Sequence, residues 1–270
     1  MVEELLLKNN KMKYFKFGSG SKTMVMVPGL SVKSVCDYEN NIISDYKIFN
    51  DEFTIYCFDR VDKPVEGYTI NDLANDLLEA ITLLNLKDIY LFGASQGGMI
   101  SFTLTINHPN LFKKLVVAST TPCIGDRLNK DLFNWVDLAK KRKKEELYDS
   151  FCKLIYPDAF YNKCSDLIKT LAKDVTDEEL DKFSILANSI HNFDIREGLK
   201  LVNIPVLMVN DKTDKLFGIE TINIVKSYIN KDIFKYHIYD GFGHALYDFA
   251  PDFKELMFNF FMGKEWFYEL

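Results

Sequence analysis

Residues 89–98 have the sequence IYLFGASQGG, which is the most informative segment of this 270-residue chain. Four apolar residues lead into a turn of small residues with Ser95 at its apex, and a helical pattern follows from Met99 onward. This order of strand, sharp turn and helix fits the G-x-S-x-G pattern, in which a strained turn lifts a serine hydroxyl above a sheet. Small residues are needed there because strand and helix almost collide. The segment therefore predicts that Ser95 is a nucleophile. The alternative, a phosphate-binding loop, is not favoured because its G-x-x-x-x-G-K-[ST] pattern is absent.

Apolar runs of similar length occur before and after this segment. Continuous apolar runs fit strands that are buried on both faces of a parallel sheet. Two shorter β-like stretches near the N-terminus, Leu5–Leu7 and Tyr14–Phe17, end at Gly18-Ser19-Gly20 and predict an opening hairpin. The further predicted strands are Met24–Val27, Thr54–Phe58, Leu115–Ala118, Val206–Val209 and Tyr236–Tyr239.

Helical patterns alternate with these strands. Apolar residues recur at spacings of three and four between Ile70 and Leu84, and Thr69 with Asp72 three residues later resembles a capping box. Later helices are predicted at Ile219–Tyr228 and at 251–262. Strands that alternate with helices are typical of a doubly wound α/β sheet.

One interval breaks this alternation. Roughly 85 residues separate the strand that ends at Ala118 from the one that begins at Val206, whereas a crossover needs only about a dozen. Helical stripes fill the interval, so we interpret residues 121–204 as an inserted helical cap. Residues 1–120 and 205–270 are then the two parts of the core. The stripes lie at 132–139, 147–154 and 176–190.

A serine nucleophile needs a histidine base. His244 lies in the loop Asp240–Ala245, directly after the last predicted strand, and ligands of open α/β sheets bind at the carboxyl ends of strands. The other three histidines are placed less suitably: one ends a helix, one lies in the cap and one lies within a strand. They are His108, His191 and His237.

The base in turn needs an orienting acid, which should follow a strand between the serine and the histidine. The run Val206–Val209 leads into a loop that contains both Asp211 and Asp214. Asp211 lies so close to the end of the strand that its side chain is expected to cap the turn there. We therefore predict Asp214 as the acid, with Asp211 as the alternative and Asp126 as a more remote one.

An oxyanion needs two backbone N–H donors. Gln96 follows the nucleophile and begins a helix, so its N–H is one candidate. The second should come from the loop after Met24–Val27, where Pro28 has no N–H. Leu30 is the predicted donor and Ser31 the alternative.

The cap contains more aromatic residues than a small helical unit can bury by itself. We expect the surplus to line a cleft beside Met99, and we predict Met99 and Trp135 as substrate-binding residues. The aromatic residues of the cap patterns are Phe133, Trp135, Phe151, Tyr156, Phe160 and Tyr161.

Composition excludes several classes of protein. A formal net charge of -6 argues against non-specific binding of nucleic acid, and the basic run Lys140–Lys144 is followed at once by Glu145-Glu146, as expected for a solvated helix face. No apolar run is long enough to span a membrane. The N-terminus is acidic and the five cysteines lack C-x-x-C spacing, which predicts reduced thiols and a cytoplasmic location. Only four histidines occur, so a His-rich metal site is not expected.

The residues up to this point resemble the α/β-hydrolase fold superfamily, in its capped, esterase-like branch. The resemblance rests on Gly93–Gly98, on Gly241–His244, and on the places of the acid loop and the cap insertion. It implies a mostly parallel sheet of about eight strands and an acyl-enzyme reaction at Ser95. Ser95 itself argues against dehalogenation, because dehalogenases of this fold carry Asp at the elbow.

Two loops depart from the family pattern. Pro28-Gly29 stands where many members have His-Gly, and Asp59-Arg60 is followed by Val61–Pro64 where many have Asp-x-Arg-Gly-His-Gly. The resemblance implies a serine hydrolase that acts on small to medium carboxylic esters, with a small-molecule acyl substrate and neither metal nor organic cofactor. The alternatives are acyl transfer or cleavage of a C–C or peroxy bond by the same residues, and a binding module without catalysis. The sequence makes no prediction of oligomeric state.

Overall fold

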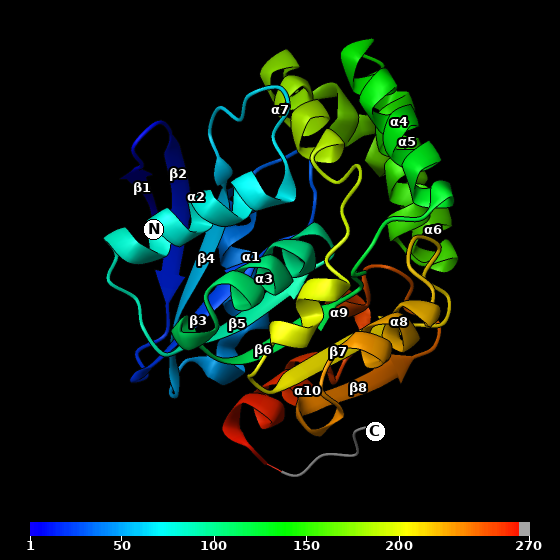
Figure 1. Ribbon diagram of the computed structural model, residues 1–270. Coiled ribbons are helices and arrows are strands. Elements are labelled where there is room, and N and C mark those ends of the chain that lie inside the picture. The colour runs from blue at the N-terminus through cyan, green and yellow to red at the C-terminus, as the bar shows by residue number, and fades with distance from the viewer. Residues whose placement is uncertain (265–270) are drawn as a thin grey trace.

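The computed structural model of the chain describes residues 1–264, and within them eight strands form one sheet (Figure 1). The strands lie in the order β1-β2-β4-β3-β5-β6-β7-β8; β2 pairs antiparallel with β1 and β4, and all other pairs are parallel. The mostly parallel α/β sheet predicted from the sequence is confirmed. The strands are β1 (Val2–Leu6), β2 (Lys11–Phe17), β3 (Lys22–Val27), β4 (Phe53–Val61), β5 (Ile89–Ala94), β6 (Phe112–Ala118), β7 (Val206–Asp211) and β8 (Phe234–Tyr239).

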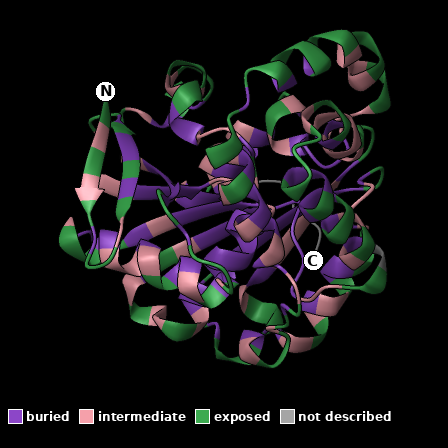
Figure 2. Cartoon of the chain, turned by 90° about the horizontal axis from the view of Figure 1, so that it is seen from above, coloured by how far each residue is buried: buried purple, intermediate pink, exposed green. Residues whose placement is uncertain are grey.

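Both faces of the inner part of the sheet are covered, which explains why strands β3 to β7 contain continuous apolar runs. Leu91 of β5 belongs to a core shared with helices α2, α3 and α8, whereas its neighbour Phe92 belongs to a core shared with α10. Buried strands accordingly run through the middle of the molecule in Figure 2, with exposed helix faces outside. The covering helices are α1 (Glu39–Asp45), α2 (Ile70–Leu83), α3 (Gln96–Asn107), α8 (Glu220–Tyr228), α9 (Leu246–Phe249) and α10 (Phe253–Met262).

Local signals in the sequence account for helix boundaries. Thr69 and Asp72 form the predicted capping box, and Thr176 and Glu179 form a second one. Gly263 ends α10 with a φ of 70°, a left-handed conformation that glycine adopts without strain. Short 3-10 helices complete the chain: η1 (Val35–Tyr38), η2 (Lys47–Phe49), η3 (Pro109–Leu111), η4 (Glu197–Leu201) and η5 (Lys231–Ile233).

The long interval between β6 and β7 forms four helices that lie together beyond the strand ends in Figure 1. The chain leaves the sheet after Ala118 and returns to the neighbouring strand, where Val116 pairs with Leu207. Trp135, Phe151 and Phe183 pack edge to face and form the centre of this helical group. The helices are α4 (Asp126–Lys140), α5 (Lys144–Ile155), α6 (Asp158–Lys173) and α7 (Asp177–Asn188).

Helix α6 was not among the predicted stripes. Its buried residues are only Ile168 and Ala172, and Leu167 and Leu171 are exposed on its surface. The apolar residues Phe160, Cys164, Leu167, Ile168 and Leu171 recur at spacings of three and four, so the sequence does carry an amphipathic stripe for this helix, although it was not among those predicted.

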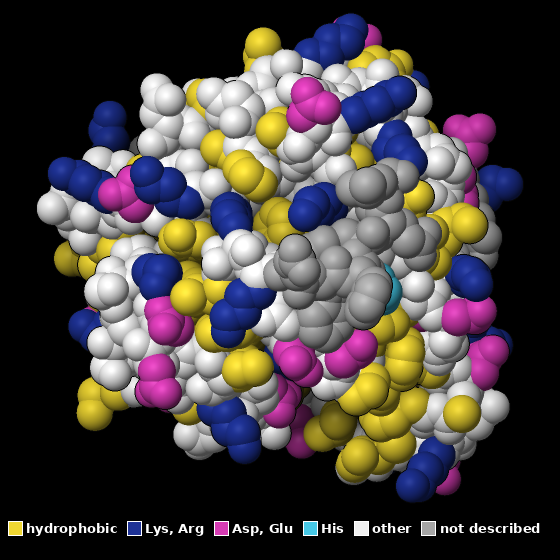
Figure 3. Space-filling view, turned by 90° about the horizontal axis from the view of Figure 1, so that it is seen from below, with side chains coloured by type: hydrophobic (Ala, Val, Ile, Leu, Met, Phe, Trp, Pro, Cys, Tyr) yellow, Lys and Arg dark blue, Asp and Glu magenta, His cyan; other side chains and the backbone are white. Residues whose placement is uncertain are grey.

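The surface of the described residues is mixed in charge. Lys and Arg side chains are interspersed with Asp and Glu on the face shown in Figure 3. Within residues 1–264, no helix combines the length and the apolar character that crossing a membrane requires.

Candidate active site

Ser95 lies at the sharp turn between β5 and α3, with φ 53° and ψ −120°. A positive φ is costly for a residue with a side chain and persists only where the surroundings impose it. Two hydrogen bonds fix the turn: Ser95 N–H donates to the Ala118 carbonyl at 2.9 Å, and the Thr120 hydroxyl donates to the Ser95 carbonyl at 2.8 Å. The strained turn that the sequence predicted is therefore present and is supported from β6.

The glycines around Ser95 are required because neighbouring backbone approaches them closely. A Cβ on Gly97 would lie 2.0 Å from the Val27 carbonyl oxygen, and a Cβ on Gly93 would lie 2.4 Å from the Gly97 carbonyl oxygen. On Gly98 a Cβ would lie 2.7 Å from the Thr120 side chain. The helix thus begins in direct contact with β3, and this contact brings the loop after β3 beside Ser95.

His244 connects Ser95 to Asp214. Its Nε2 lies 2.9 Å from Ser95 Oγ, and its Nδ1 lies 2.9 Å from Asp214 Oδ2. The imidazole is 1% exposed. The three residues come from loops after β5, β7 and β8, which are parallel, so their carboxyl ends meet at one edge of the sheet.

The two candidate acids have different surroundings. Asp214 Oδ1 accepts the N–H groups of Leu216 and Phe217 at 2.8 and 3.0 Å, which leaves Oδ2 directed at His244. Asp211 lies on the other side of the turn. Its carboxylate accepts hydrogen bonds from Thr213, Gly241 and Phe242, so it joins the acid loop to the histidine loop.

The loop Pro28–Ser31 runs past the nucleophile. A Cβ on Gly29 would lie 3.2 Å from Ser95 Cβ and 3.8 Å from Ser95 Oγ. Neither the Leu30 N–H nor the Gln96 N–H donates a hydrogen bond to another described residue. Ser31, the alternative oxyanion donor, lines the cavity that also contains Ser95. Its hydroxyl donates a hydrogen bond to the Lys33 carbonyl.

A cavity of about 420 Å³ opens above Ser95 and His244. The predicted substrate-binding residues Met99 and Trp135 both line it, and so do Phe151 and Tyr156. Trp135 also serves the helical group, since its indole N–H donates to the Ser150 hydroxyl. Further apolar lining comes from Leu128, Leu132, Ile155, Ile190, Leu216 and Phe217.

Three aromatic residues of the α4–α7 region do not line this cavity. Phe133 is 61% exposed and stacks on His191, with ring centroids 4.2 Å apart. Phe160 packs on Phe249, and the hydroxyl of Tyr161 donates to Asp149 at 2.5 Å.

The remaining histidines lie elsewhere. His191 Nδ1 lies 3.0 Å from the Asn129 side-chain oxygen. His237 lies within β8 beside Tyr239, and His108 ends α3. No group of three or more potential metal ligands occurs in the described part of the chain.

One rim of the cavity is polar, which the sequence did not indicate. Asp45 and Asp248 line it together with Asn41. Asp248 is exposed at this rim, and partial desolvation by the neighbouring groups raises the pKa of its carboxyl group to about 6.

Sequence reasoning also missed Arg60. This residue is buried behind the loop Pro28–Ser31, and burial lowers the pKa of its guanidinium to about 10. The signal in the sequence is the charged pair Asp59-Arg60, which directly follows a buried apolar run.

The geometry fits nucleophilic chemistry. An imidazole that accepts a proton from a hydroxyl, and is held by a carboxylate on its other nitrogen, can activate that hydroxyl for attack on a carbonyl carbon. The N–H groups of Leu30 and Gln96 are not used by another described residue, and donors of this kind can stabilise the oxyanion that such an attack creates.

Several known proteins are similar to this chain. The profile of a family described as alpha/beta hydrolase fold matches residues 50–251. Pimeloyl-[acyl-carrier protein] methyl ester esterase of Wigglesworthia glossinidia brevipalpis is 26% identical over 241 residues, which cover 84% of this chain and 88% of that protein. The 3-oxoadipate enol-lactonase 2 of Acinetobacter baylyi is 21% identical over 174 residues, covering 62% and 63% of the two chains.

Solved structures agree on the fold. MGS-M2, an alpha/beta hydrolase enzyme from a Medee basin deep-sea metagenome library, matches with a TM-score of 0.87 at 19% identity, covering 99% of this chain and all of that one. The enol-lactonase from Burkholderia xenovorans LB400 matches with a TM-score of 0.82 at 16% identity, covering 96% and 100%.

Proposed function

Since the chain belongs to the alpha/beta hydrolase fold family, we propose that it is a serine hydrolase that cleaves small to medium carboxylic esters. The observation that carries the proposal is the hydrogen-bonded series from Ser95 Oγ through His244 to Asp214, at 2.9 Å for each step. It lies at the base of a mostly apolar cavity, where an acyl group can be held next to the hydroxyl.

The reaction proceeds in two steps. Ser95 attacks the ester carbonyl while His244 takes the hydroxyl proton, and Asp214 stabilises the imidazolium that forms. The N–H groups of Leu30 and Gln96 bind the oxyanion. His244 then gives its proton to the leaving alcohol and later activates water, which releases the acid from the acyl-enzyme.

Residues 121–204 serve as the cap in this proposal. Leu132 and Trp135 of α4 and Phe151 of α5 form part of the cavity wall above Ser95. At the end of α5, the Ile155 carbonyl accepts the N–H of Ala245, so the cap is also joined to the histidine loop. A wall of this kind limits the length of the acyl group that fits.

The relatives support hydrolysis rather than another reaction. One is named as a methyl ester esterase and another as an enol-lactonase, and a lactone is a cyclic ester. Acyl transfer, cleavage of C–C or peroxy bonds, and binding without catalysis remain the competing functions.

Hydrolysis of p-nitrophenyl butyrate tests the proposal. Ser95→Ala should lose on the order of 10⁶ in kcat, as expected when a nucleophile of this machinery is removed. Near-wild-type turnover by pure Ser95→Ala protein would reject it. Product analysis with and without an added alcohol separates hydrolysis from acyl transfer, because a transferase would form the new ester in preference to the free acid.

A further inference from the structure

Arg60 is a buried cation without a carboxylate partner. It is 7% exposed, and among the described residues no ion pair involves its guanidinium. Its hydrogen bonds go to neutral oxygens instead: Nη2 donates to the Pro28 carbonyl at 2.5 Å, and Nε and Nη2 each lie 3.3 Å from Oε1 of Gln96.

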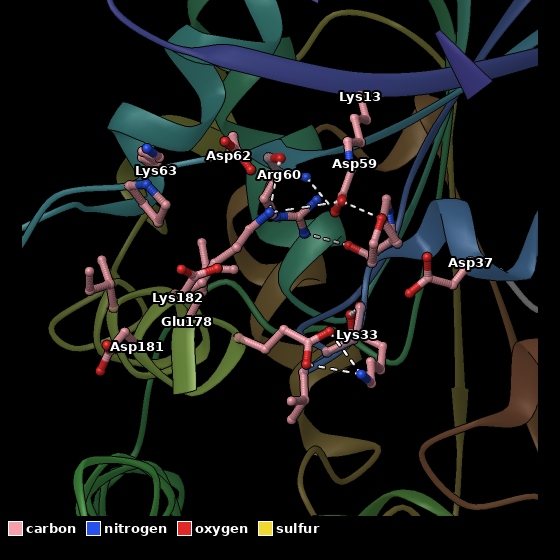
Figure 4. Close-up of a pocket in the computed structure, with 18 of the residues that line it drawn as sticks. Lys13, Lys33, Asp37, Asp59, Arg60, Asp62, Lys63, Glu178, Asp181 and Lys182 are labelled. Atoms are coloured by element: carbon pink, nitrogen blue, oxygen red, sulfur yellow. Dashed lines mark hydrogen bonds and ion pairs between the residues drawn. The ribbon is translucent and has the colours of Figure 1, made fainter. Parts of the chain in front are cut away.

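The neighbouring acid Asp59 attracts this charge through space, but no salt bridge joins the two side chains. Asp59 accepts the backbone N–H of Arg60 and the hydroxyl of Ser34, and it lies 3.8 Å from Lys182 Nζ. Figure 4 shows Arg60 and Asp59, at the end of β4, close to Lys182 of α7. An unpaired buried charge destabilises a fold, and a purely structural contact to two oxygens does not require a cation. The retained charge therefore calls for another explanation.

The two partners of Arg60 belong to the two halves of the proposed oxyanion hole. Pro28 lies two residues before Leu30, and Gln96 carries the other donor on its own backbone. Gln96 is held from the far side too, because its amide donates to the Leu186 carbonyl at 2.7 Å and lies 3.3 Å from the Ser189 hydroxyl. Arg60 thus joins the loop after β3 to the start of α3, and Gln96 joins both to the end of α7.

We propose that Arg60 is a positioning residue that fixes the Leu30 and Gln96 N–H groups for the oxyanion and adds a positive charge behind them. Arg60 does not line the cavity above Ser95; it lines a separate polar cavity of about 590 Å³ on the other side of the loop Pro28–Ser31. It therefore acts through the loop and not on the substrate. Fixed donors and charges aimed at developing charge are effective in sites that exclude water.

This inference rests on the proposed function and makes a separate prediction. Arg60→Met removes the charge and both contacts while keeping an unbranched side chain. We expect kcat, expressed per active site as counted by titration, to fall about 10- to 100-fold. This loss is smaller than the one caused by removing a whole oxyanion donor, and KM should change by no more than about threefold. Binding of an alkylboronic acid, which mimics the tetrahedral intermediate, should weaken by a similar factor. Arg60→Lys should give an intermediate kcat, because a single ammonium group cannot bond both the Pro28 carbonyl and the Gln96 side chain as the planar guanidinium does.

Arg196→Met is the matched control. Arg196 is an exposed arginine whose guanidinium pairs with Asp194, away from the cavity above Ser95. It should keep wild-type kcat and boronic acid affinity. If Arg60→Met does not fold, Gln96→Met serves instead, since it removes the side-chain contacts of Gln96 and leaves its backbone donor; we then expect a loss of about tenfold in kcat.

The outcomes separate the two claims. Turnover that does not depend on Ser95 rejects the proposed function itself. Ser95-dependent turnover with unchanged kcat and boronic acid affinity in folded Arg60→Met rejects the positioning role alone. A lower melting temperature with unchanged kcat per titrated site would show that Arg60 is only structural, and it also rejects the inference.

Discussion

Nδ1 of His244 lies 2.9 Å from Oδ2 of Asp214, and both side chains are almost fully buried. The second oxygen of this carboxylate is held by two backbone N–H groups, so the acid cannot rotate away without losing them. Asp211, three residues earlier, bonds the backbone of the histidine loop instead. The two acids of one loop therefore have separable roles.

Replacing each acid with its amide tests this separation. Asp214→Asn should lower kcat by roughly 10⁴, because the asparagine amide stabilises the wrong tautomer of the His244 imidazole. Asp211→Asn keeps an acceptor oxygen on only one side of the carboxylate, so either Gly241 or Phe242 loses its acceptor. We expect a loss of stability of about 1–3 kcal/mol and a much smaller change in kcat than for Asp214→Asn. Steady-state kinetics and urea unfolding measure both. The reverse ranking in kcat would mean that Asp211 is the functional acid.

A substitution at Gly97 tests the close packing beneath Ser95. A methyl group there would lie 2.0 Å from the Val27 carbonyl oxygen, and backbone cannot move aside cheaply. Gly97→Ala should destabilise the protein by at least about 3 kcal/mol. Gly125→Ala is the control, since nothing lies within 4 Å of its added methyl group. Its cost should stay near or below about 1 kcal/mol, from the weaker helix start. Equal costs for the two variants would contradict the packing argument.

The size and lining of the cavity above Ser95 predict a preference for soluble substrates. Its volume of about 420 Å³ and its apolar wall from α4 and α5 suit short acyl or aryl groups. We expect hydrolysis of p-nitrophenyl acetate and butyrate and little activity on emulsified triolein, measured on one preparation. A clear preference for the emulsion would indicate that residues 121–204 move aside at a lipid surface.

The carboxyl group of Asp76 should make the stability of the folded protein depend on pH. Burial raises the pKa of this carboxyl group to about 6, and its Oδ2 is buried without a hydrogen-bond partner. The folded state then binds more protons than the unfolded state between pH 3.8 and about 6, so stability falls as pH rises through this window and the penalty remains above it.

Asp76→Asn removes that penalty. Because the side chain is only part-buried, we discount the gain to about 1 kcal/mol, or roughly 2 °C in melting temperature, at about pH 7.5. At about pH 4 wild type and variant should melt within about 1 °C of each other, since the carboxyl is then protonated in the folded state. A gain that is the same at both pH values would show that ionisation of Asp76 is not its cause.

Local patterns in the sequence predicted most of the fold. The turn at Ser95 and the loop before His244 each follow a buried strand, and both are recognisable from consecutive residues. The capping boxes at Thr69 and Thr176 are local in the same way. Parallel pairing of the strands then brings their carboxyl ends together, so the positions of Ser95, Asp214 and His244 followed from the fold class.

Contacts between distant segments account for what the sequence did not show. Arg60 acquires its partners only when β4 lies beside β3 and α3, and Gln96 meets Leu186 from 90 residues away. Phe133 and Trp135 are two residues apart and therefore lie on opposite sides of α4, which is why one is exposed and the other is buried. The polar rim at Asp45 and Asp248 likewise joins α1 to α9.

Covalent labelling of Ser95 examines the proposed chemistry without assuming any substrate. A fluorophosphonate reacts only with a serine that a base activates, so intact-mass analysis should show one adduct per chain, and peptide mapping should place it on Ser95. Ser95→Ala should give no adduct, and His244→Ala should react far more slowly. A folded wild-type protein that forms no adduct, or an adduct that persists in Ser95→Ala, would contradict the assignment of Ser95 as the nucleophile.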